Sequence, residues 1–423
     1  MTEILKILII YPIFLIFIFV PFPVFNKINN KLNLDLLTVN LIINCNILLF
    51  FSLTGIKIKD YQSFLILFYI LIFLFYLIKF KINPLKIKTN FIIFYFCFFI
   101  LGCVVASELN FGWDAKYFYY IKSLFFYEGL GLNELSKFEH NKWHPHLGSY
   151  FWAFFWSLPF FEIEYFGRFF YLFIFCFSIY FVTIESNKNV LFNYTLFLTT
   201  LLMTFNYERF SGLQEVLIFS FLIISAKILY DIKISNRFFK ISLILMIANL
   251  ILWIKSEGIV YAFFLITILM INKNISIKEK IFTSFIFLLL ILFKNFVFSY
   301  YNFELISQPY NFAFIKLIDL NEFFYRLLNI IIYGGYYSLK NILFLIGIFI
   351  LIKLYLFKNH QININNFVIF FILNILFIIF AYTFRDMEII YSLKTTLERI
   401  IFTSSAFYIY LVILYINQKF KIN

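Results

Sequence analysis

Charged residues are scarce in this chain of 423 residues: they make up 13% of it, whereas hydrophobic residues make up 63%. A soluble domain with so little charge would expose large apolar patches and aggregate. Apolar runs of about 18 residues or more recur along the chain, and runs of that length can cross a bilayer as helices. The sequence therefore predicts an all-α, polytopic membrane protein.

Signatures of several other protein classes are also missing. The formal charge of +13 is spread over many short segments and forms no dense basic block, so nucleic acid is not an expected partner. The cysteines Cys45, Cys97, Cys103 and Cys176 lie within apolar runs without metal-ligand spacing, and we expect them to be inert packing residues. No stretch resembles a Walker loop or a Rossmann fingerprint, which argues against an ATP-driven mechanism within the chain.

The apolar runs predict about 13 membrane spans and two shorter helices. The expected spans are residues 4–26, 36–56, 62–80, 90–107, 165–184, 190–207, 211–230, 238–254, 258–272, 280–300, 339–357, 364–384 and 397–417. The shorter pieces, 146–161 and 322–338, are interrupted by Pro159 and by Gly334-Gly335. We expect both to lie at the membrane surface or to dip into it.

One stretch, from Ser107 to Arg168, concentrates polar side chains that elsewhere occur only in short gaps between apolar runs. It contains eight acidic or basic residues before a group of three histidines, His140, His144 and His146. The chain is therefore expected to consist of N-terminal transmembrane helices (1–107), a polar loop with juxtamembrane helices (108–164) and a helical bundle (165–423).

The distribution of Lys and Arg predicts which side of the membrane this polar loop faces. If it faces outward, most of the basic loops face the cytoplasm; Lys57 and Lys59 are the exception. We therefore expect an integral, multi-pass protein of the bacterial inner membrane with its active site outside. The same arrangement places three distant polar groups on the side of the loop: Glu208, Arg209 and Glu215; Lys255 and Glu257; and Arg385, Asp386, Glu388, Glu398 and Arg399.

Asp114 is the first candidate for chemistry in the loop. Residues 113–128 are expected to form a helix with Asp114 in its first turn and Gly129 as a stop signal. A carboxylate in that position can cap the helix, because the macrodipole favours a negative charge there, or it can act as a general base. Both interpretations stay open on position alone.

Acids and bases near the ends of spans are the second group of candidates, because such residues are costly close to the membrane. Glu208 and Glu215 are seven residues apart, so we expect them on one helix face, with Glu215 in a sugar-binding role or an interhelical ion pair. Lys255 and Glu257 form either a snorkelling interfacial pair or, through a helix break at Gly258, a pair that faces a cavity.

The histidines are the third group. His144-x-His146, with His140 and Glu139 nearby, could bind a metal. Interfacial histidines also serve as hydrogen-bonding loop residues or bind a leaving phosphate or an acceptor. The sequence thus predicts no definite cofactor and leaves a divalent metal open.

Several short motifs in this order resemble the GT-C glycosyltransferases, which are polytopic enzymes that use polyprenyl-phosphate sugars and include protein mannosyltransferases and lipid A aminoarabinose transferases. The matching pieces are Trp113-Asp114, Trp143-His144-Pro145-His146-Leu147, Gly167-Arg168, Trp253-Ile254-Lys255-Ser256-Glu257-Gly258 and Leu393-Lys394-Thr395-Thr396-Leu397-Glu398-Arg399. The chain departs from the family pattern where Ala115 replaces a second acid, where His146 replaces a second proline, and in three extra spans before the loop.

The resemblance implies inverting transfer of a sugar from a polyprenyl-phosphate donor to a hydroxyl of a lipid, glycan or protein. It implies Asp114 as general base. The other implied roles are His144 and His146 at the rim of the site, Glu208, Glu215 and Glu257 in the sugar pocket, and Lys255, Arg385 and Arg399 at the phosphate. A polysaccharide polymerase or ligase, which usually has a late polar loop, and a transporter or flippase, for which a repeat of two halves is typical, remain the alternatives.

Overall fold

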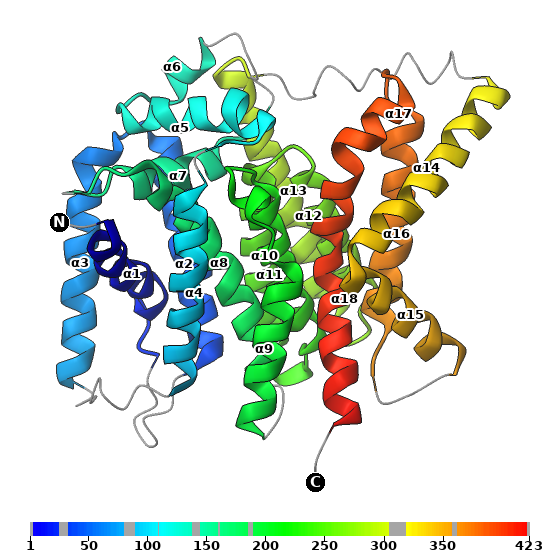
Figure 1. Cartoon of the computed structure of the whole chain (residues 1–423), viewed down its shortest axis with the longest axis horizontal. Helices are drawn as coiled ribbons and strands as arrows, with labels where there is room; N and C mark the ends of the chain where they lie inside the picture. The colour runs from blue at the N-terminus through cyan, green and yellow to red at the C-terminus, as the bar shows by residue number, and fades with distance from the viewer. Residues whose placement is uncertain are drawn as a thin grey trace.

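The computed structural model describes most of the chain, and every regular element in the described part is a helix (Figure 1). The described residues are 3–24, 33–79, 89–108, 110–137, 144–159, 161–184, 189–303, 319–357 and 362–420. Seven helical segments within them are long and apolar enough to cross a membrane, and an eighth is added if one bent pair counts as a single span. An integral, multi-pass membrane protein has this composition.

Four helices precede the polar loop: α1 (Glu3–Phe19), α2 (Leu34–Thr54), α3 (Ile58–Lys79) and α4 (Thr89–Ser107). The expected first span, 4–26, is too long: α1 ends at Phe19, because Pro21 and Pro23 have no backbone N–H to continue it. The polar loop contains three short helices, α5 (Tyr120–Tyr127), α6 (Leu132–Ser136) and α7 (Leu147–Trp156).

Helix α7 corresponds to the expected short helix at 146–161 and ends at Trp156. All ten of its residues are buried, because α5, α8, α2 and α11 pack around it. The nearly uninterrupted run of bulky apolar side chains along α7 explains this, since a helix that is hydrophobic on all sides is stable only when it is covered.

The remaining helices form the bundle that follows the loop. They are α8 (Glu164–Thr183), α9 (Val190–Thr204), α10 (Glu215–Tyr230), α11 (Arg237–Ile254), α12 (Gly258–Ile271), α13 (Ile277–Tyr300), α14 (Leu320–Lys340), α15 (Ile342–Leu356), α16 (Asn365–Thr383), α17 (Ile389–Ser392) and α18 (Glu398–Lys419). Helix α8 lies at the centre, where it packs against α4, α7 and α10, and α10 in turn packs against α18.

The expected short helix at 322–338 and the expected span at 339–357 correspond to α14 and α15, which form one bent pair. Helices α14 and α15 meet at Asn341 with an angle of 108° between them. The break was expected at Gly334-Gly335, but both glycines continue the α14 helix. Asn341 causes the break, because its side chain caps the start of α15 by accepting a hydrogen bond from the backbone of Phe344.

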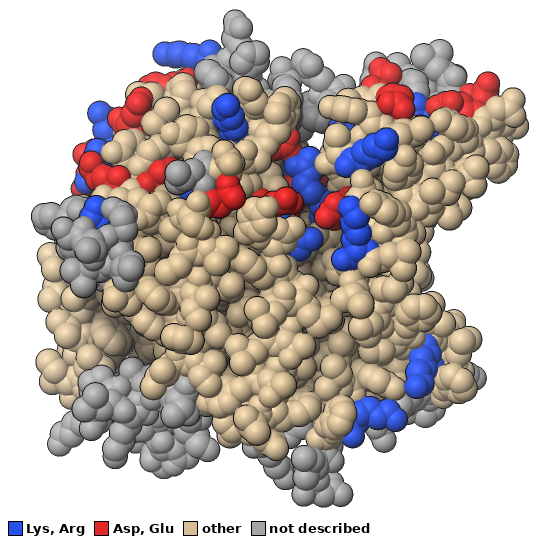
Figure 2. Space-filling view, in the orientation of Figure 1, with Lys and Arg blue, Asp and Glu red and all other residues tan. Residues whose placement is uncertain are grey.

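One end of the bundle, here called the polar end, carries α5, α6, α7 and α17 and lies at the top of Figure 1. Helices α4 and α11 end there, and α8, α10 and α18 begin there. Figure 2 shows many charged side chains at this end, above a broad band with few of them. Lys57 and Lys59 also lie at the polar end: Lys59 is 3.5 Å from Glu162 of the loop in an exposed ion pair.

Candidate functional site

Five charged side chains meet at the polar end and are here called the charged cluster: Asp114, Glu215, Lys255, Glu257 and Arg399. Glu215 Oε1 lies 2.7 Å from Lys255 Nζ and 3.3 Å from Arg399 Nη1. Arg399 Nη1 also contacts Asp114 Oδ2, and Lys255 Nζ lies 3.4 Å from Glu257 Oε1. The sequence singled out all five residues, and the structure connects them in one network. Figure 2 shows a hollow at this end with acidic and basic side chains gathered around it.

Four members of the cluster stand at helix ends, and Arg399 lies within the continuous helical segment Ile389–Lys419, just after its π-turn. Glu215 is the first residue of α10, Lys255 and Glu257 form the turn between α11 and α12, and Arg399 is the second residue of α18. Asp114 follows the short connection after α4, in the helical turn that leads to α5. Helix ends leave backbone groups without intrahelical partners, so polar side chains and ligands can be accommodated there.

Two π-helical turns flank the contact between Asp114 and Arg399. One spans Ala115–Tyr119, directly after Asp114, and the other spans Leu393–Leu397, two residues before Arg399. A π-turn inserts an extra residue into a helix and thereby changes the direction in which neighbouring side chains point; such turns are frequent at functional sites. Neither turn was predicted from the sequence.

Two glycines allow the close approaches that build the cluster. Gly212 has a φ of +99°, and a Cβ there would stand 2.9 Å from the Cβ of Ala115, so only glycine lets this segment contact the turn after Asp114. A Cβ on Gly258 would stand 2.0 Å from the backbone oxygen of Ile251. The tight turn that holds Lys255 and Glu257 therefore requires glycine at 258, and the helix break expected there is confirmed.

Arg168 fixes the segment that leads to Asp114. Its side chain is fully buried and pairs with Glu164 one turn earlier, with Nε 2.9 Å from Oε1. The same guanidinium donates to the backbone oxygens of Val105 (3.4 Å) and Glu108 (3.0 Å) at the end of α4. These bonds satisfy carbonyl groups that the end of a helix leaves open.

Arg326 has the equivalent role on the side of Arg399, and it was not predicted from the sequence. It is buried, pairs with Glu322 at 2.6 Å, and donates to the backbone oxygens of Tyr382 (3.3 Å) and Arg385 (2.8 Å). The signal in the sequence was the Glu-x-x-x-Arg spacing, which Arg326 shares with Arg168. Arg168 holds the end of α4, from which the chain continues to Asp114. Arg326 holds the end of α16, from which the chain continues to Arg399.

Three buried polar atoms around the cluster have no hydrogen-bond partner within the described residues: Tyr119 Oη, Glu215 Oε2 and Glu257 Oε2. Burial raises the pKa of Tyr119, and the carboxylates of Glu215 and Glu257 add to that effect against the opposing charge of Lys255. Tyr119 therefore stays a neutral donor beside two carboxylate acceptors. A ligand rich in hydroxyl groups can satisfy all three atoms.

Lys255 stays charged although it is buried. Burial lowers the pKa of its ammonium group, but the carboxylates of Glu215 and Glu257 outweigh burial and raise the pKa well above its ordinary value. The cluster thus holds three carboxylates and two fixed cations.

His144 lies next to the cluster. Its Nδ1 is 3.4 Å from Ser256 Oγ, and its ring packs against Phe118 and Tyr119. Burial, followed by the charges of Lys122 and Lys255, lowers the pKa of His144 well below its ordinary value. The imidazole is therefore neutral and can donate and accept hydrogen bonds at the rim of the cluster.

His146 was expected at the rim of the site, and the structure places its side chain outside the charged cluster. His146 is buried between Phe126 and Trp253, and its Nε2 lies 2.9 Å from Ser52 Oγ of α2. Burial lowers the pKa of His146 to about 3, so the ring stays neutral and ties α2 to the start of α7. His144 and His146 thus have different surroundings, which their spacing in the sequence did not reveal.

Glu208 and Arg385 also lie outside the charged cluster. Glu208 is exposed in a 3₁₀ turn, Tyr207–Phe210, and α10 begins only at Glu215, so the two acids do not share a helix face as expected. Arg385 Nη1 lies 3.4 Å from Thr396 Oγ1, one turn before Arg399. Arg209 stacks on the ring of Phe402, 3.7 Å from its centre, and therefore braces α18.

The described residues contain no group of three His, Cys, Asp or Glu side chains that could hold a metal ion. His140 and Glu139, which the sequence analysis considered as further metal ligands, lie outside the described residues. The carboxylates of the cluster are instead paired with Lys255 and Arg399.

Lys122 is a buried lysine that was not singled out from the sequence. It lies in α5, and its Nζ donates a hydrogen bond to the backbone oxygen of His144. Burial lowers the pKa of Lys122 to about 7. Its position within the apolar run Tyr117–Tyr127 was the available signal, because a lysine in such a run is often buried by its neighbours.

Replacing Lys122 by Met should change how stability depends on pH. In the unfolded chain the side chain of Lys122 has the ordinary pKa of a lysine, 10.5, whereas in the folded chain its pKa is about 7. Between these values the unfolded state binds the extra proton, so stability increases as the pH rises from 7 towards 10.5, by about 1.4 kcal/mol per pH unit at most. The midpoint of thermal unfolding, measured from pH 7 to pH 9.5, should rise more steeply for the wild type than for Lys122→Met.

The matched control for this comparison is Lys116→Met, which removes an exposed lysine from the same loop and should keep the wild-type slope. Equal slopes for the wild type and Lys122→Met would show that Lys122 is charged in the folded protein throughout this pH range.

Comparison of the chain with protein-family models, with curated proteins and with solved structures gave no match. The function is therefore inferred from the contacts, burial and charge of the residues in the charged cluster.

Proposed function

We propose that this chain is a membrane glycosyltransferase that moves a sugar from a polyprenyl-phosphate donor to an acceptor hydroxyl, with inversion at the sugar carbon. The observation that carries the proposal is the charged cluster, in which Asp114, Glu215, Lys255, Glu257 and Arg399 come together from four distant segments at one end of the bundle. Buried charges are costly, and a network of them at a partly open site is typical of catalysis.

The cluster contains the groups that such a transfer requires. The acceptor oxygen attacks the anomeric carbon as the bond from that carbon to the phosphate oxygen breaks, and the acceptor proton moves to a base. Asp114 is that base, because its side chain is 21% exposed and can meet an incoming hydroxyl. Arg399 and Lys255 supply fixed positive charge for the phosphate that leaves.

The remaining polar atoms of the cluster suit the sugar. Glu215 Oε2 and Glu257 Oε2 are acceptors, and Tyr119 Oη is a donor, which matches the hydroxyl groups on a sugar ring. His144 forms one border of this pocket. Pre-placed partners on a rigid bundle hold the donor in the reactive geometry, which is a major source of rate enhancement.

We also propose how this enzyme crosses the membrane. The chain crosses the bacterial inner membrane 13 times, with α14 and α15 together forming one crossing, and the polar end faces outward. The position of the cluster at one end of the bundle favours an enzyme at the membrane surface. A transporter would instead place its charges at broken helices near the middle of the bilayer.

The test is transfer by the purified protein from a panel of polyprenyl-phosphate sugars that carry a labelled hexose, pentose or amino sugar. We expect release of polyprenyl phosphate together with label in the acceptor fraction of a membrane extract for at least one donor. Transfer from a nucleotide sugar would contradict the proposal, as would a folded protein that turns over no donor in the panel. Label that crosses sealed vesicles on an intact donor would indicate a flippase instead.

A further inference from the structure

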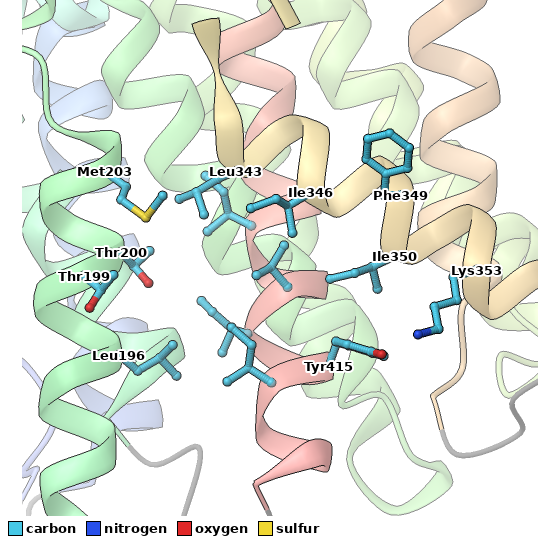
Figure 3. A pocket seen from close by; sticks show the side chains of 14 residues that line it. Leu196, Thr199, Thr200, Met203, Leu343, Ile346, Phe349, Ile350, Lys353 and Tyr415 are labelled. Atoms are coloured by element: carbon cyan, nitrogen blue, oxygen red, sulfur yellow. The ribbon is translucent and has the colours of Figure 1, made fainter. Parts of the chain in front are cut away.

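A groove of about 510 Å³ lies between α9, α15 and α18, away from the charged cluster (Figure 3). Its walls are almost entirely apolar: Leu196 and Met203 from α9, Leu343 and Phe349 from α15, and Ile409 and Ile413 from α18 contribute to them. The volume falls within the range of about 300–1,000 Å³ that is usual for ligand sites.

Lys353 is the one charged residue that lines the groove. It stands one turn before the end of α15, and its side chain is exposed. Figure 3 shows Lys353 beside Tyr415, and the ammonium group lies 5.8 Å from the centre of that ring. No salt bridge to Lys353 occurs within the described residues, so its charge is available to an anionic group.

The groove runs toward the end of the bundle opposite the polar end. Met203 and Leu343 lie nearer the middle of the bundle, and Tyr415 lies close to the end of α18 at Lys419. The residues of α15 that line it, from Leu343 to Lys353, cover about 15 Å along the helix. A long apolar chain with one anionic end fits this layout better than a compact molecule does.

The groove is also open to the surroundings of the bundle. Phe349 is 62% exposed and Ile346 is 37% exposed, although both line the groove. In a membrane protein, exposed apolar surfaces of this kind face the hydrocarbon of the bilayer, which is as apolar as they are. Basic residues between transmembrane helices near one membrane surface recognise anionic lipid headgroups.

We propose that this groove binds one acyl chain of an anionic glycerophospholipid, with the phosphate group at Lys353. The bound lipid would brace α15 against α9, two helices that contact each other only at a few residues. Because α15 continues α14, and α14 packs against the π-turn at Leu393–Leu397, the lipid also supports the segment that positions Arg399. This inference does not depend on the proposed function.

Native mass spectrometry of the delipidated protein in detergent tests the proposal, with phosphatidylglycerol and phosphatidylcholine of identical acyl chains as probes. We expect one phosphatidylglycerol to bind about fivefold more tightly than phosphatidylcholine, the equivalent of about 1 kcal/mol for one lysine at the membrane surface. Lys353→Gln should abolish this preference. The control Lys419→Gln, which removes an exposed lysine at the same end that does not line the groove, should keep it.

A second variant, Ile346→Trp, fills the groove without changing its charge and should reduce the binding of both lipids while the protein stays folded. Equal affinity of the wild type for the two lipids would overturn the proposal, and so would an unchanged preference in Lys353→Gln. Stronger binding of a polyprenyl phosphate than of phosphatidylglycerol would also overturn it, because the groove would then be a donor site. None of these measurements uses transferase activity.

Discussion

Replacing Asp114 by Asn is expected to lower the rate of sugar transfer by about 10²–10⁴-fold, which is the usual contribution of a general base. The amide of Asn cannot take the proton from the acceptor hydroxyl, so the attacking oxygen must carry that proton into the transition state. Binding of the donor should change little, because Lys255 and Arg399 remain in place to contact its phosphate.

The same substitution should leave the fold nearly unchanged. The side chains of Asp114 and Arg399 are 21% and 25% exposed, and a partly solvated ion pair contributes about 1 kcal/mol or less. Asn keeps an oxygen in the same place that can accept a hydrogen bond from Arg399. A large loss of rate with a small shift in the midpoint of unfolding would therefore be a chemical effect rather than a structural one.

Single-turnover transfer with the best donor, together with the donor dissociation constant, separates these effects. Asp60→Asn is the matched control: it makes the same chemical change at an exposed residue at the start of α3, also at the polar end, and should keep full activity. Full activity in Asp114→Asn would remove Asp114 from the mechanism and leave it as a partner that positions Arg399.

Hydropathy and charge were sufficient to predict that the site residues share one end of the bundle. An apolar run must cross the bilayer as a helix, so consecutive runs alternate in direction and the ends of alternate runs lie on the same side. The order of spans therefore placed Asp114, Glu215, Lys255 and Arg399 together before any contact was known. It could not say that Glu215 would stand between two cations, because hydropathy does not determine which helices are neighbours.

The sequence pattern could not predict the local geometry of the site, for a different reason. The π-turns at Ala115–Tyr119 and Leu393–Leu397 differ from an α-helix by one hydrogen-bond register, and the composition of these segments does not reveal that register. The burial of His146 and Arg326 depends on helices far away in the chain. Polar residues near a helix end look alike in sequence, whether they face the site or tie two helices together.

Removing one partner of the buried pair between Glu215 and Lys255 should destabilise the protein strongly, whereas removing both should not. These side chains are only 7% and 9% exposed, and their atoms are 2.7 Å apart. Glu215→Leu leaves a buried ammonium group with Glu257 alone, and Lys255→Met leaves a buried carboxylate beside Arg399. We expect each single variant to lower the free energy of unfolding by about 3 kcal/mol, since breaking a buried pair typically costs about 3–5 kcal/mol and each remaining charge keeps one partner.

The double variant, Glu215→Leu with Lys255→Met, should recover most of this loss, because an apolar replacement for a buried ion pair is often neutral or stabilising. It should nevertheless stay inactive. It lacks the carboxylate of Glu215 that accepts hydrogen bonds from the sugar, and it lacks the positive charge of Lys255 that stabilises the leaving phosphate. Equilibrium unfolding in mixed detergent micelles gives the coupling free energy from the four proteins.

The exposed pair between Lys59 and Glu162 is the matched control for this cycle. Its side chains are 53% and 55% exposed, so the same substitutions, Lys59→Met and Glu162→Leu, should show a coupling of about 1 kcal/mol or less. If the coupling between Glu215 and Lys255 were equally small, water would have to reach the charged cluster freely, and the cost of buried charge would no longer indicate a dedicated site. A large coupling in an active double variant would show instead that the pair serves the fold alone.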